Sequence, residues 1–348
     1  MLALTGLSPA RLARLVPEVR LDEARKIVSV ALRTGALPKG IPQVRKSALE
    51  AVRAACVIPA LEVVAHEKSD VDPFEKLAFD SFEAKGAARF EAVRIPLQKP
   101  GRFSVCVSSQ AGCALACAFC ATGKLGLLRN LEAWEIVEQV RAVKRTLGVG
   151  QRVHGVVFQG MGEPMANLDR VLQAIEVLMD PSALAIDARA MTVCTSGLPA
   201  GIRRLADEAP NVRLGWSIGS ARREVRRTLM PIENANPLEQ VVEACVYHAR
   251  ITGLAPMWAF TPLAGVNDSD DDARALAALA KSFAARAGVR PRISVIPFNA
   301  FDGDAFARST REDAFRATMQ GEGVFSHLRY SGAGDIAASC GQLAAKLS

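Results

Sequence analysis

Aromatic residues are scarce in this chain, at 5% of 348 residues, with only three Trp and two Tyr. Half of the residues are apolar, so a sizeable core must be built mainly from Ala, Val, Leu and Ile. The sequence also lacks any run of about 18 uncharged apolar residues, the length that spans a membrane as a helix. The first twenty residues have no basic segment before their apolar positions. We therefore expect neither a signal peptide nor a membrane anchor.

Histidine is rare as well, and its four positions show no metal-ligand spacing: His66, His154, His248 and His327. Any bound metal would therefore need other ligands, and eight cysteines are available. We expect the chain in the reducing cytoplasm. Cysteines in that compartment are better explained by chemistry than by a disulfide framework.

Three of the cysteines lie close together, because Cys113, Cys117 and Cys120 follow the spacing C-x3-C-x2-C. One short loop can place these thiolates around a single metal centre. Three thiolates are one too few for a closed structural zinc site, which is four-coordinate. They do suit an iron–sulfur cluster in which one iron stays open. An RNA-binding protein with a structural zinc is the alternative from a different class.

The net charge of +7 is concentrated near the start of the chain, where residues 1–60 hold ten Lys or Arg against four acidic residues. A concentrated basic surface indicates a polyanionic partner, most simply nucleic acid. A solvated helical surface explains the charge equally well. Apolar residues recur with helical spacing over 21–36 and 44–56, with prolines between them. We therefore expect a small, basic, helical accessory domain over residues 1–60.

The rest of the chain changes from short strands to a regular alternation of strands and helices. Residues 61–102 are expected to form a small antiparallel unit that links the two domains, with strands at 61–66, 75–80 and 88–96. In the domain over 103–348, the expected strands are 103–109, 154–160, 189–196, 212–218, 256–261 and 293–298. Helices are expected between them at 132–146, 168–179, 238–252 and 272–287. This alternation predicts an α/β fold with a parallel sheet, and six repeats fit a partial (β/α)6 barrel at least as well as an open sheet. The tail is expected to hold a short strand at 327–331 and a last helix that begins near Ile336.

Functional residues of such folds collect at the carboxyl ends of the strands. The cysteine loop follows the first predicted strand, the motif GMGEP (160–164) follows the second, Cys194 lies near the end of the third, and Asn299 ends the sixth. The two glycines of GMGEP permit close approach of a ligand to the backbone. The Glu163 carboxylate can accept hydrogen bonds from a ligand ammonium group.

Taken in order, these motifs resemble the RlmN/Cfr family of radical S-adenosylmethionine (SAM) RNA methyltransferases. The segments that carry the resemblance are CVSSQAGCALACAFCATG, GMGEPMAN, RRTLMPI, GVND, RISVIPFN and GDIAASCGQL. It is strong over residues 88–345 and looser over 1–87, where RKIVSVALRTG resembles the family's helical accessory domain. The most discriminating feature is a pair of distant cysteines, Cys106 before the cluster motif and Cys340 near the end. The implied fold is a partial (β/α)6 radical SAM barrel.

The resemblance implies one [4Fe–4S] cluster on Cys113, Cys117 and Cys120, and two SAM molecules per turnover. It also implies a set of SAM contacts: Gly162, Glu163, Cys194, Ser217, Ile218, Gly219 and Asn299. Three places depart from the family pattern. Cys194 stands where the family usually has Ser, Gly219 where it has the His of S-L-H-A, and residues 330–333 replace an Arg-rich approach to Cys340.

By the same resemblance, Cys340 takes a methyl group from a first SAM. A second SAM is cleaved at the cluster to a 5′-deoxyadenosyl radical, which abstracts a hydrogen atom from the S-methyl group. The resulting methylene radical adds to an adenine ring carbon, and a disulfide between Cys106 and Cys340 releases the product. Glu91 matches the position of the proton acceptor.

The implied target is carbon 2 of an adenosine in 23S ribosomal RNA, with transfer RNA as a second substrate. Methylation at carbon 8 is a close alternative, and the altered segment 217–219 leaves a non-RNA substrate open as well. The expected partners are RNA, which would contact the basic residues of 1–60, and an electron-donor protein such as flavodoxin. We expect a monomer.

Overall fold

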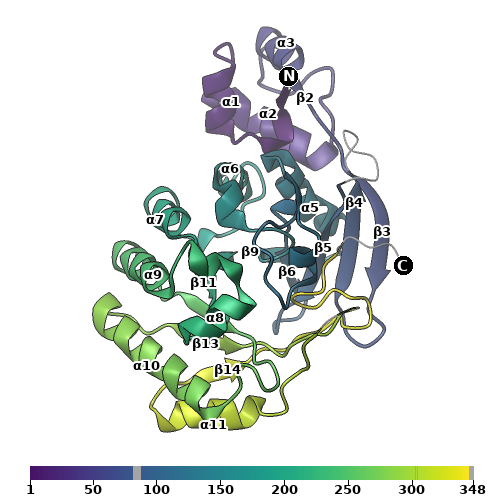
Figure 1. Ribbon diagram of the computed structural model, residues 1–348. Coiled ribbons are helices and arrows are strands. Elements are labelled where there is room, and N and C mark those ends of the chain that lie inside the picture. Colours follow the sequence, from purple (N-terminus) through teal and green to yellow (C-terminus); the bar gives the residue numbers. More distant parts are fainter. Residues whose placement is uncertain (81–87, 302, 304, 345–348) are drawn as a thin grey trace.

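The computed structural model describes residues 1–80, 88–301, 303 and 305–344. Its main sheet has ten strands in the order β14-β13-β12-β11-β10-β9-β6-β5-β4-β3. The strands from β6 to β14 all pair in parallel, and helices cover the outer side of this curved sheet (Figure 1). The predicted α/β class with a partial barrel is therefore confirmed.

Each of the six predicted parallel strands is present, and the tail strand adds a seventh. Their bounds are β6 Arg102–Cys106, β9 Arg152–Phe158, β10 Met191–Thr195, β11 Arg213–Ser217, β12 Met257–Phe260, β13 Arg292–Val295 and β14 Ser326–Leu328. All seven end one to three residues earlier than the sequence pattern predicts, because the chain already turns into the loops that line the cavity described below.

Three antiparallel strands extend the same sheet beyond β6: β3 Glu62–Lys68, β4 Glu75–Asp80 and β5 Phe90–Pro96. They are the strands predicted over residues 61–102. Strand β5 pairs directly with β6, with Val93 opposite Cys106, so hydrogen bonds cross the proposed boundary at residue 102. The division of the chain into domains stays a prediction.

The helices that cover the sheet alternate with its strands: α5 Ala133–Arg145, α6 Leu168–Met179, α7 Pro199–Glu208, α8 Arg223–Leu229, α9 Leu238–Thr252, α10 Asp270–Ala287 and α11 Glu312–Gly321. The predicted last helix near Ile336 is wrong. Residues 329–344 form turns instead, since Ala333 and Ala337 have φ values of 64° and 48°, which a right-handed helix excludes.

The N-terminal segment contains α1 Pro9–Leu15, α2 Leu21–Thr34 and α3 Lys46–Ala55, with a two-stranded parallel pair of β1 Leu2–Ala3 and β2 Cys56–Val57. Helices α1 and α2 pack on α6 and α5 (Figure 1). Arg141 of α5 donates to the Leu32 carbonyl at 2.6 Å, and Arg11 pairs with Glu176 of α6 at 2.7 Å.

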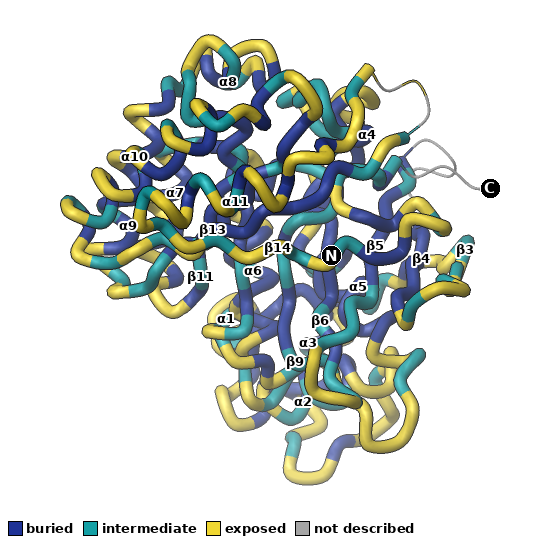
Figure 2. The backbone as a smooth tube through the Cα atoms, turned by 90° about the horizontal axis from the view of Figure 1, so that it is seen from below, coloured by how far each residue is buried: buried dark blue, intermediate teal, exposed yellow. Residues whose placement is uncertain are grey.

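One cluster of buried apolar residues runs from these N-terminal helices into the barrel. Figure 2 shows the strands as mostly buried, inside a surface of exposed helix faces and loops. Among the described residues, none of the helices has both the length and the apolar character needed to cross a bilayer.

Candidate active site

The three clustered cysteines lie on one loop, residues 113–126, which we call the cluster loop. It is closed by a short antiparallel pair, β7 Gln110–Gly112 and β8 Leu127–Asn130, and contains α4 Ala121–Lys124. Gly112 has a φ of 74°, and a Cβ there would lie 1.9 Å from the Gly126 carbonyl oxygen. Only glycine allows the two ends of the loop to approach this closely.

The cluster cysteines fit a metal cluster by their ligand chemistry. Burial raises the pKa of Cys113 to about 11 and that of Cys117 to about 12, and it also raises the pKa of Cys120. These thiols therefore need a cation to bind as thiolates, which is what a cluster provides. In the part of the chain that the structure describes, no three His, Cys, Asp or Glu side chains are arranged around one metal ion. A cubane cluster takes each thiolate on a different iron, so it does not require three sulfurs to meet at one point.

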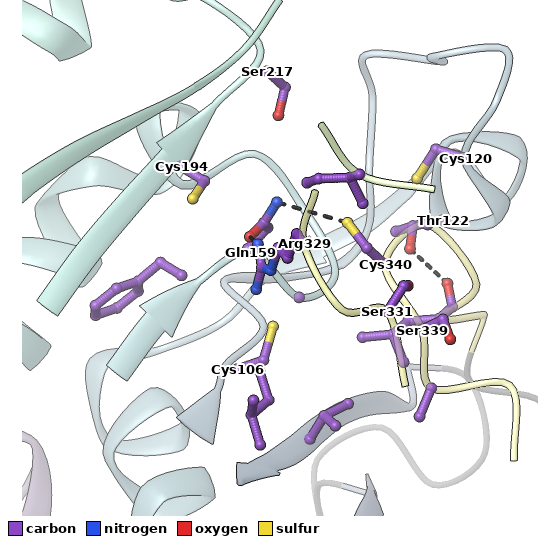
Figure 3. A pocket seen from close by; sticks show the side chains of 18 of the residues that line it. Cys106, Cys120, Thr122, Gln159, Cys194, Ser217, Arg329, Ser331, Ser339 and Cys340 are labelled. Carbon is purple, nitrogen blue, oxygen red and sulfur yellow. Dashed lines mark hydrogen bonds between the residues drawn. The ribbon is translucent and has the colours of Figure 1, made fainter. Parts of the chain in front are cut away.

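A cavity of about 1200 Å³, measured with its open mouth, lies at the carboxyl ends of the parallel strands; we call it the main cavity. Cys117 and Cys120 line it on the side of the cluster loop. Cys113 is partly buried in the same loop and is not among the lining residues. Figure 3 shows this cavity from close by.

The GMGEP loop after β9 forms another wall of the main cavity, and its glycines serve the packing of the protein itself. A Cβ on Gly160 would lie 2.7 Å from the Val107 carbonyl oxygen, and one on Gly162 would lie 2.5 Å from the Gln110 Cβ. Their missing Cβ positions face the segment before the cluster loop, while both glycines also line the cavity, so close approach of a ligand to their backbone stays a prediction.

Glu163 of the same motif is buried in the cavity wall. Its carboxylate accepts hydrogen bonds from the Met165 and Ser196 amides at 3.0 and 2.8 Å. Burial raises its pKa, although these hydrogen bonds partly oppose the shift. A ligand ammonium at this carboxylate would offset the cost of burial, because opposite charges favour the ionised form.

Cys106 and Cys340 are brought together although they lie at opposite ends of the barrel sequence. Cys106 ends β6, and Cys340 belongs to residues 329–344, a segment that we call the strap. Both sulfurs face the middle of the main cavity (Figure 3). Burial raises the pKa of Cys106 to about 12, and the neighbouring Cys340 thiol adds to this shift. The same cavity therefore holds two cluster cysteines and two further thiols.

Two residues that the sequence analysis missed connect these sulfurs. Gln159 donates from Nε2 to the Cys340 sulfur at 3.6 Å, and Arg329 donates to Gln159 Oε1 at 3.1 Å. The positive charge of Arg329 opposes the rise in pKa at both Cys106 and Cys340. Gln159 directly follows β9 and Arg329 directly follows β14, so the rule about strand ends could have found both.

The residues expected to contact SAM divide into two groups. Cys194 and Ser217 line the main cavity, as do Gly162 and Glu163. Ile218 is fully buried in the core instead, and Asn299 donates to the Cys340 carbonyl at 3.2 Å and to Ser331 Oγ at 2.8 Å. Asn299 therefore holds the strap in this arrangement.

Gly219 lies outside the main cavity and has no room for a side chain. Its φ is 69°, and a Cβ would come within 2.3 Å of the Met230 sulfur. Met230 thus occupies the space that the imidazole of the family pattern would need. The Gly219 carbonyl accepts a hydrogen bond from Asn267 at 2.8 Å.

Glu91 lies on β5 at 1% exposure and lines a second, neighbouring cavity. One carboxylate oxygen is 3.5 Å from Lys76 Nζ, and the other accepts from the Ala344 amide at 3.1 Å. The carboxylate therefore holds the end of the strap, and it is not among the residues that line the main cavity.

A buried ion pair behind the main cavity ties two of its loops together. Arg226 of α8 and Glu233 are both fully buried and form an ion pair. Arg226 also donates to the Ser196 carbonyl at 2.8 Å and to the Ile218 carbonyl at 3.1 Å. Since these carbonyls follow β10 and β11, one guanidinium fixes the ends of two neighbouring strands.

Comparison with known proteins agrees with this geometry. The sequence pattern of the Radical SAM superfamily matches residues 107–279. The crystal structure of a radical SAM methyltransferase from Sphaerobacter thermophilus superposes with a TM-score of 0.87 and 32% identity, covering 99% of this chain and 100% of that chain. The fold and the site therefore define a radical SAM methyltransferase.

Two related sequences narrow this class. A probable RNA methyltransferase from Sorangium cellulosum is 57% identical over 94% of this chain and 88% of the relative. The dual-specificity RNA methyltransferase RlmN from Syntrophobacter fumaroxidans is 39% identical over 83% of this chain and 81% of the relative. The chain belongs to the RlmN/Cfr family, and it is a SAM-dependent RNA methyltransferase.

Membership implies a [4Fe–4S] cluster and SAM as cofactors and RNA as the substrate. It argues against the two alternatives held open by the sequence, a zinc-stabilised RNA-binding protein and an enzyme with a non-RNA substrate.

Proposed function

We propose that this enzyme methylates a ring carbon of adenine in RNA, with carbon 2 of an adenosine in 23S ribosomal RNA as the main target and transfer RNA as a second one. The observation that supports the proposal is that Cys106 and Cys340 line one cavity with Cys117 and Cys120. Carbon 2 of adenine is electron-poor and does not attack the methyl group of SAM directly. A methyl carrier next to a radical-generating cluster provides another route.

In this proposal the chain supplies binding, positioning and two reactive sulfurs. Cys113, Cys117 and Cys120 hold the cluster, which when bound supplies the electron that cleaves SAM. Of the seven SAM contacts predicted from the sequence, four line the main cavity: Gly162, Glu163, Cys194 and Ser217. Contacts of SAM with Ile218, Gly219 and Asn299 stay predictions. The proposed stoichiometry is two SAM molecules per turnover.

Cys340 is proposed as the methyl carrier and Cys106 as the residue that forms a disulfide with it and releases the product. Arg329 and Gln159 assist by two contacts: the guanidinium charge favours thiolate at both sulfurs, and the amide of Gln159 holds the Cys340 sulfur. A thiolate is the reactive form of cysteine in such polar steps. The role of Glu91 as proton acceptor stays a prediction, because its carboxylate faces the second cavity.

RNA would meet the exposed basic side chains of the N-terminal segment, among them Arg14, Arg25 and Arg33 of the helices and Lys39 of the loop after α2. The target adenine has to leave its stack to reach the main cavity, as bases modified on the ring generally do. We further propose a monomeric enzyme that takes electrons from a protein such as flavodoxin. Its eight free cysteines fit a reducing cytoplasm.

The test is to map methyladenosines by mass spectrometry in ribosomal and transfer RNA from a deletion strain and from the same strain complemented with this protein. A methyl group on carbon 2 that depends on the protein supports the proposal, and one on carbon 8 moves the target to the other ring position. Unchanged adenine methylation in both RNAs would contradict the proposal.

Two variants test the proposed sulfurs. Cys340→Ala should give no methylated cysteine and no product. Cys106→Ala should keep the methyl carrier but leave the protein covalently joined to RNA, which denaturing gels detect. Cys245→Ala is the matched control, because Cys245 is a buried thiol in α9 that does not line the main cavity. Free turnover by the Cys106 variant would contradict its role.

A further inference from the structure

The strap that carries Cys340 is fastened to a distant part of the chain, the turn between β3 and β4 (residues 69–74). The Asp335 carboxylate of the strap accepts hydrogen bonds from Ser69 Oγ at 2.8 Å and from the Asp70 amide at 2.9 Å. In the opposite direction, the Asp72 carboxylate of the turn accepts from the Ala333 amide at 2.8 Å and from the Tyr330 hydroxyl at 3.0 Å. Two carboxylates, one on each side, thus hold the same junction.

The junction is also closely packed. A Cβ on Gly332 would lie 2.4 Å from Asp72 Oδ2 and 2.6 Å from the Phe74 ring, so only glycine fits at this place in the strap. The rings of Phe74 and Tyr330 are 6.2 Å apart. In Figure 1 the C-terminal segment crosses from β14 to the turn between β3 and β4, which joins the two ends of the sheet.

Hydrogen bonds within the strap connect this junction to the residues directly before Cys340. Ser339 Oγ donates to the Gly332 carbonyl at 2.6 Å, and the Ala338 amide donates to the Ala333 carbonyl at 2.9 Å. The two residues before Cys340 are therefore tied to Ala333, which donates to Asp72, and to its neighbour Gly332. Hydrogen bonds within the strap therefore link the contacts with Asp72 to the residues next to Cys340.

The other side of Cys340 is held by the cluster loop. The Ala121 amide donates to the Gly341 carbonyl at 2.8 Å, and Thr122 donates to the Leu343 carbonyl at 2.5 Å. These contacts are made by the residues directly after Cys120. The position of the Cys340 sulfur is thus set from two sides, by the cluster loop and by the turn between β3 and β4.

We propose that Asp72 and Asp335 are positioning residues for Cys340, because they latch the strap to the turn between β3 and β4 and so keep the sulfur inside the main cavity. The inference rests on the proposed function in one respect, that Cys340 carries the methyl group. Cys340 is an exposed residue at the main cavity. With the latch removed, the strap leaves the turn, and the Cys340 thiol moves away from the cavity wall and reacts faster with reagents in solution. Transfer to RNA then slows while the cluster stays in place.

The test measures how fast iodoacetamide alkylates Cys340 in the anaerobic, cluster-containing enzyme, by mass spectrometry of the Cys340 peptide. We expect Asp72→Ala and Asp335→Ala each to raise this rate about tenfold or more, because each removes two hydrogen bonds of the junction. The double variant should exceed both. Asp70→Ala is the matched control: it removes a carboxylate from the same turn but keeps the amide that Asp335 accepts from.

Cys245 provides an internal reference, because this fully buried thiol is alkylated only when the protein opens globally. A merely destabilised variant would raise the rates of Cys245 and Cys340 together, whereas release of the latch raises only that of Cys340. Gly332→Ala gives a second, independent perturbation, since its added Cβ must displace Asp72. It should raise the Cys340 rate at unchanged iron content.

The outcomes separate the two proposals. Faster alkylation of Cys340 with a parallel loss of RNA methylation supports both. Faster alkylation with unchanged RNA methylation supports the latch and contradicts Cys340 as methyl carrier. Unchanged alkylation of Cys340 in the double variant and in Gly332→Ala overturns the latch, whatever RNA methylation does, and so does an equal rise at Cys245.

Discussion

Substitution Glu233→Gln tests whether the buried guanidinium behind the main cavity depends on its partner. Arg226 and Glu233 are both fully buried, and burial already lowers the pKa of Arg226. Removing the carboxylate charge leaves an uncompensated buried cation, which costs about 3–5 kcal/mol. With an unfolding entropy of about 2.1 cal/mol/K per residue, this corresponds to a fall in melting temperature of about 4–7 °C for a chain of this length.

The assay is anaerobic thermal unfolding of the cluster-containing enzyme, together with titration of SAM. Glu224→Gln is the matched control: it makes the same chemical change on the neighbouring helix α8, in an exposed pair with Arg222. Exposed pairs contribute about 0–1 kcal/mol, so this control should melt close to the parent.

A double variant separates charge from positioning. Arg226→Met with Glu233→Leu should recover most of the lost stability, because two apolar residues replace a buried ion pair without leaving a charge. It should still bind SAM more weakly than the parent, since the bonds to the Ser196 and Ile218 carbonyls are gone. Equal melting temperatures for Glu233→Gln and Glu224→Gln would refute the reasoning.

Gly112→Ala should severely lower the iron content of the purified enzyme, because its Cβ would lie 1.9 Å from the Gly126 carbonyl oxygen. Gly126→Ala is the control and should lose less iron, because a Cβ at Gly126 meets nothing within 4 Å. Equal iron contents in the two variants would contradict this prediction. His248 is fully buried, and burial lowers its pKa to about 4 from 6.5. As the pH falls, His248 therefore takes up a proton in the unfolded chain before it does so in the folded one. The stability linked to neutral His248 is complete above pH 6.5 and is lost as the pH falls toward 4. Between pH 7.5 and 5.5, the free energy of unfolding measured in urea should therefore fall by about 1 kcal/mol less in His248→Phe than in the parent. If it falls equally in both, groups other than His248 cause the pH dependence. Glu91→Gln keeps an acceptor for the Ala344 amide, so iodoacetamide should alkylate Cys340 at the parental rate. If Glu91 is the proton acceptor, RNA methylation should fall by about two orders of magnitude, and parental activity would leave it only the structural role.

The sequence predicted the elements of the fold well, because strongly periodic segments determine their own structure. Helices α6 and α9 have the predicted bounds 168–179 and 238–252, and the antiparallel strand β4 has the predicted bounds 75–80. The rule that strand ends gather at one rim predicted that the cluster loop, Glu163 and Cys194 lie together, and Cys117, Cys120, Glu163 and Cys194 line one cavity.

Pairings between distant segments were the part that local patterns could not supply. Nothing in residues 61–102 indicates that β5 will pair with β6, because each strand reads as an ordinary amphipathic segment whichever partner it takes. The strap illustrates the same limit. Its alanines have helical propensity, but Asp72, Thr122 and Asn299 hold it in turns from elsewhere in the sequence, and tertiary contacts override propensity.

The surroundings of the site residues lay beyond local patterns for a similar reason. Met230 fills the space beside Gly219, and a contact of the Gly219 backbone with SAM stays a prediction. Lys76 and Ala344 contact the Glu91 carboxylate, and the role of Glu91 as proton acceptor stays a prediction. In each case the decisive neighbour lies on another element, so the residue itself carried no local signal.

The order of synthesis has a consequence for how the enzyme matures. The cluster loop leaves the ribosome long before Cys340, and at about 5–20 residues per second this interval is roughly ten seconds or more. Throughout that time the cysteines at 113, 117 and 120 have no strap over them, since its anchors at Ala121 and Thr122 wait for Gly341 and Leu343. In a nascent chain the cluster cysteines are therefore open to iron and sulfide, and the strap, which is translated later, covers them afterwards.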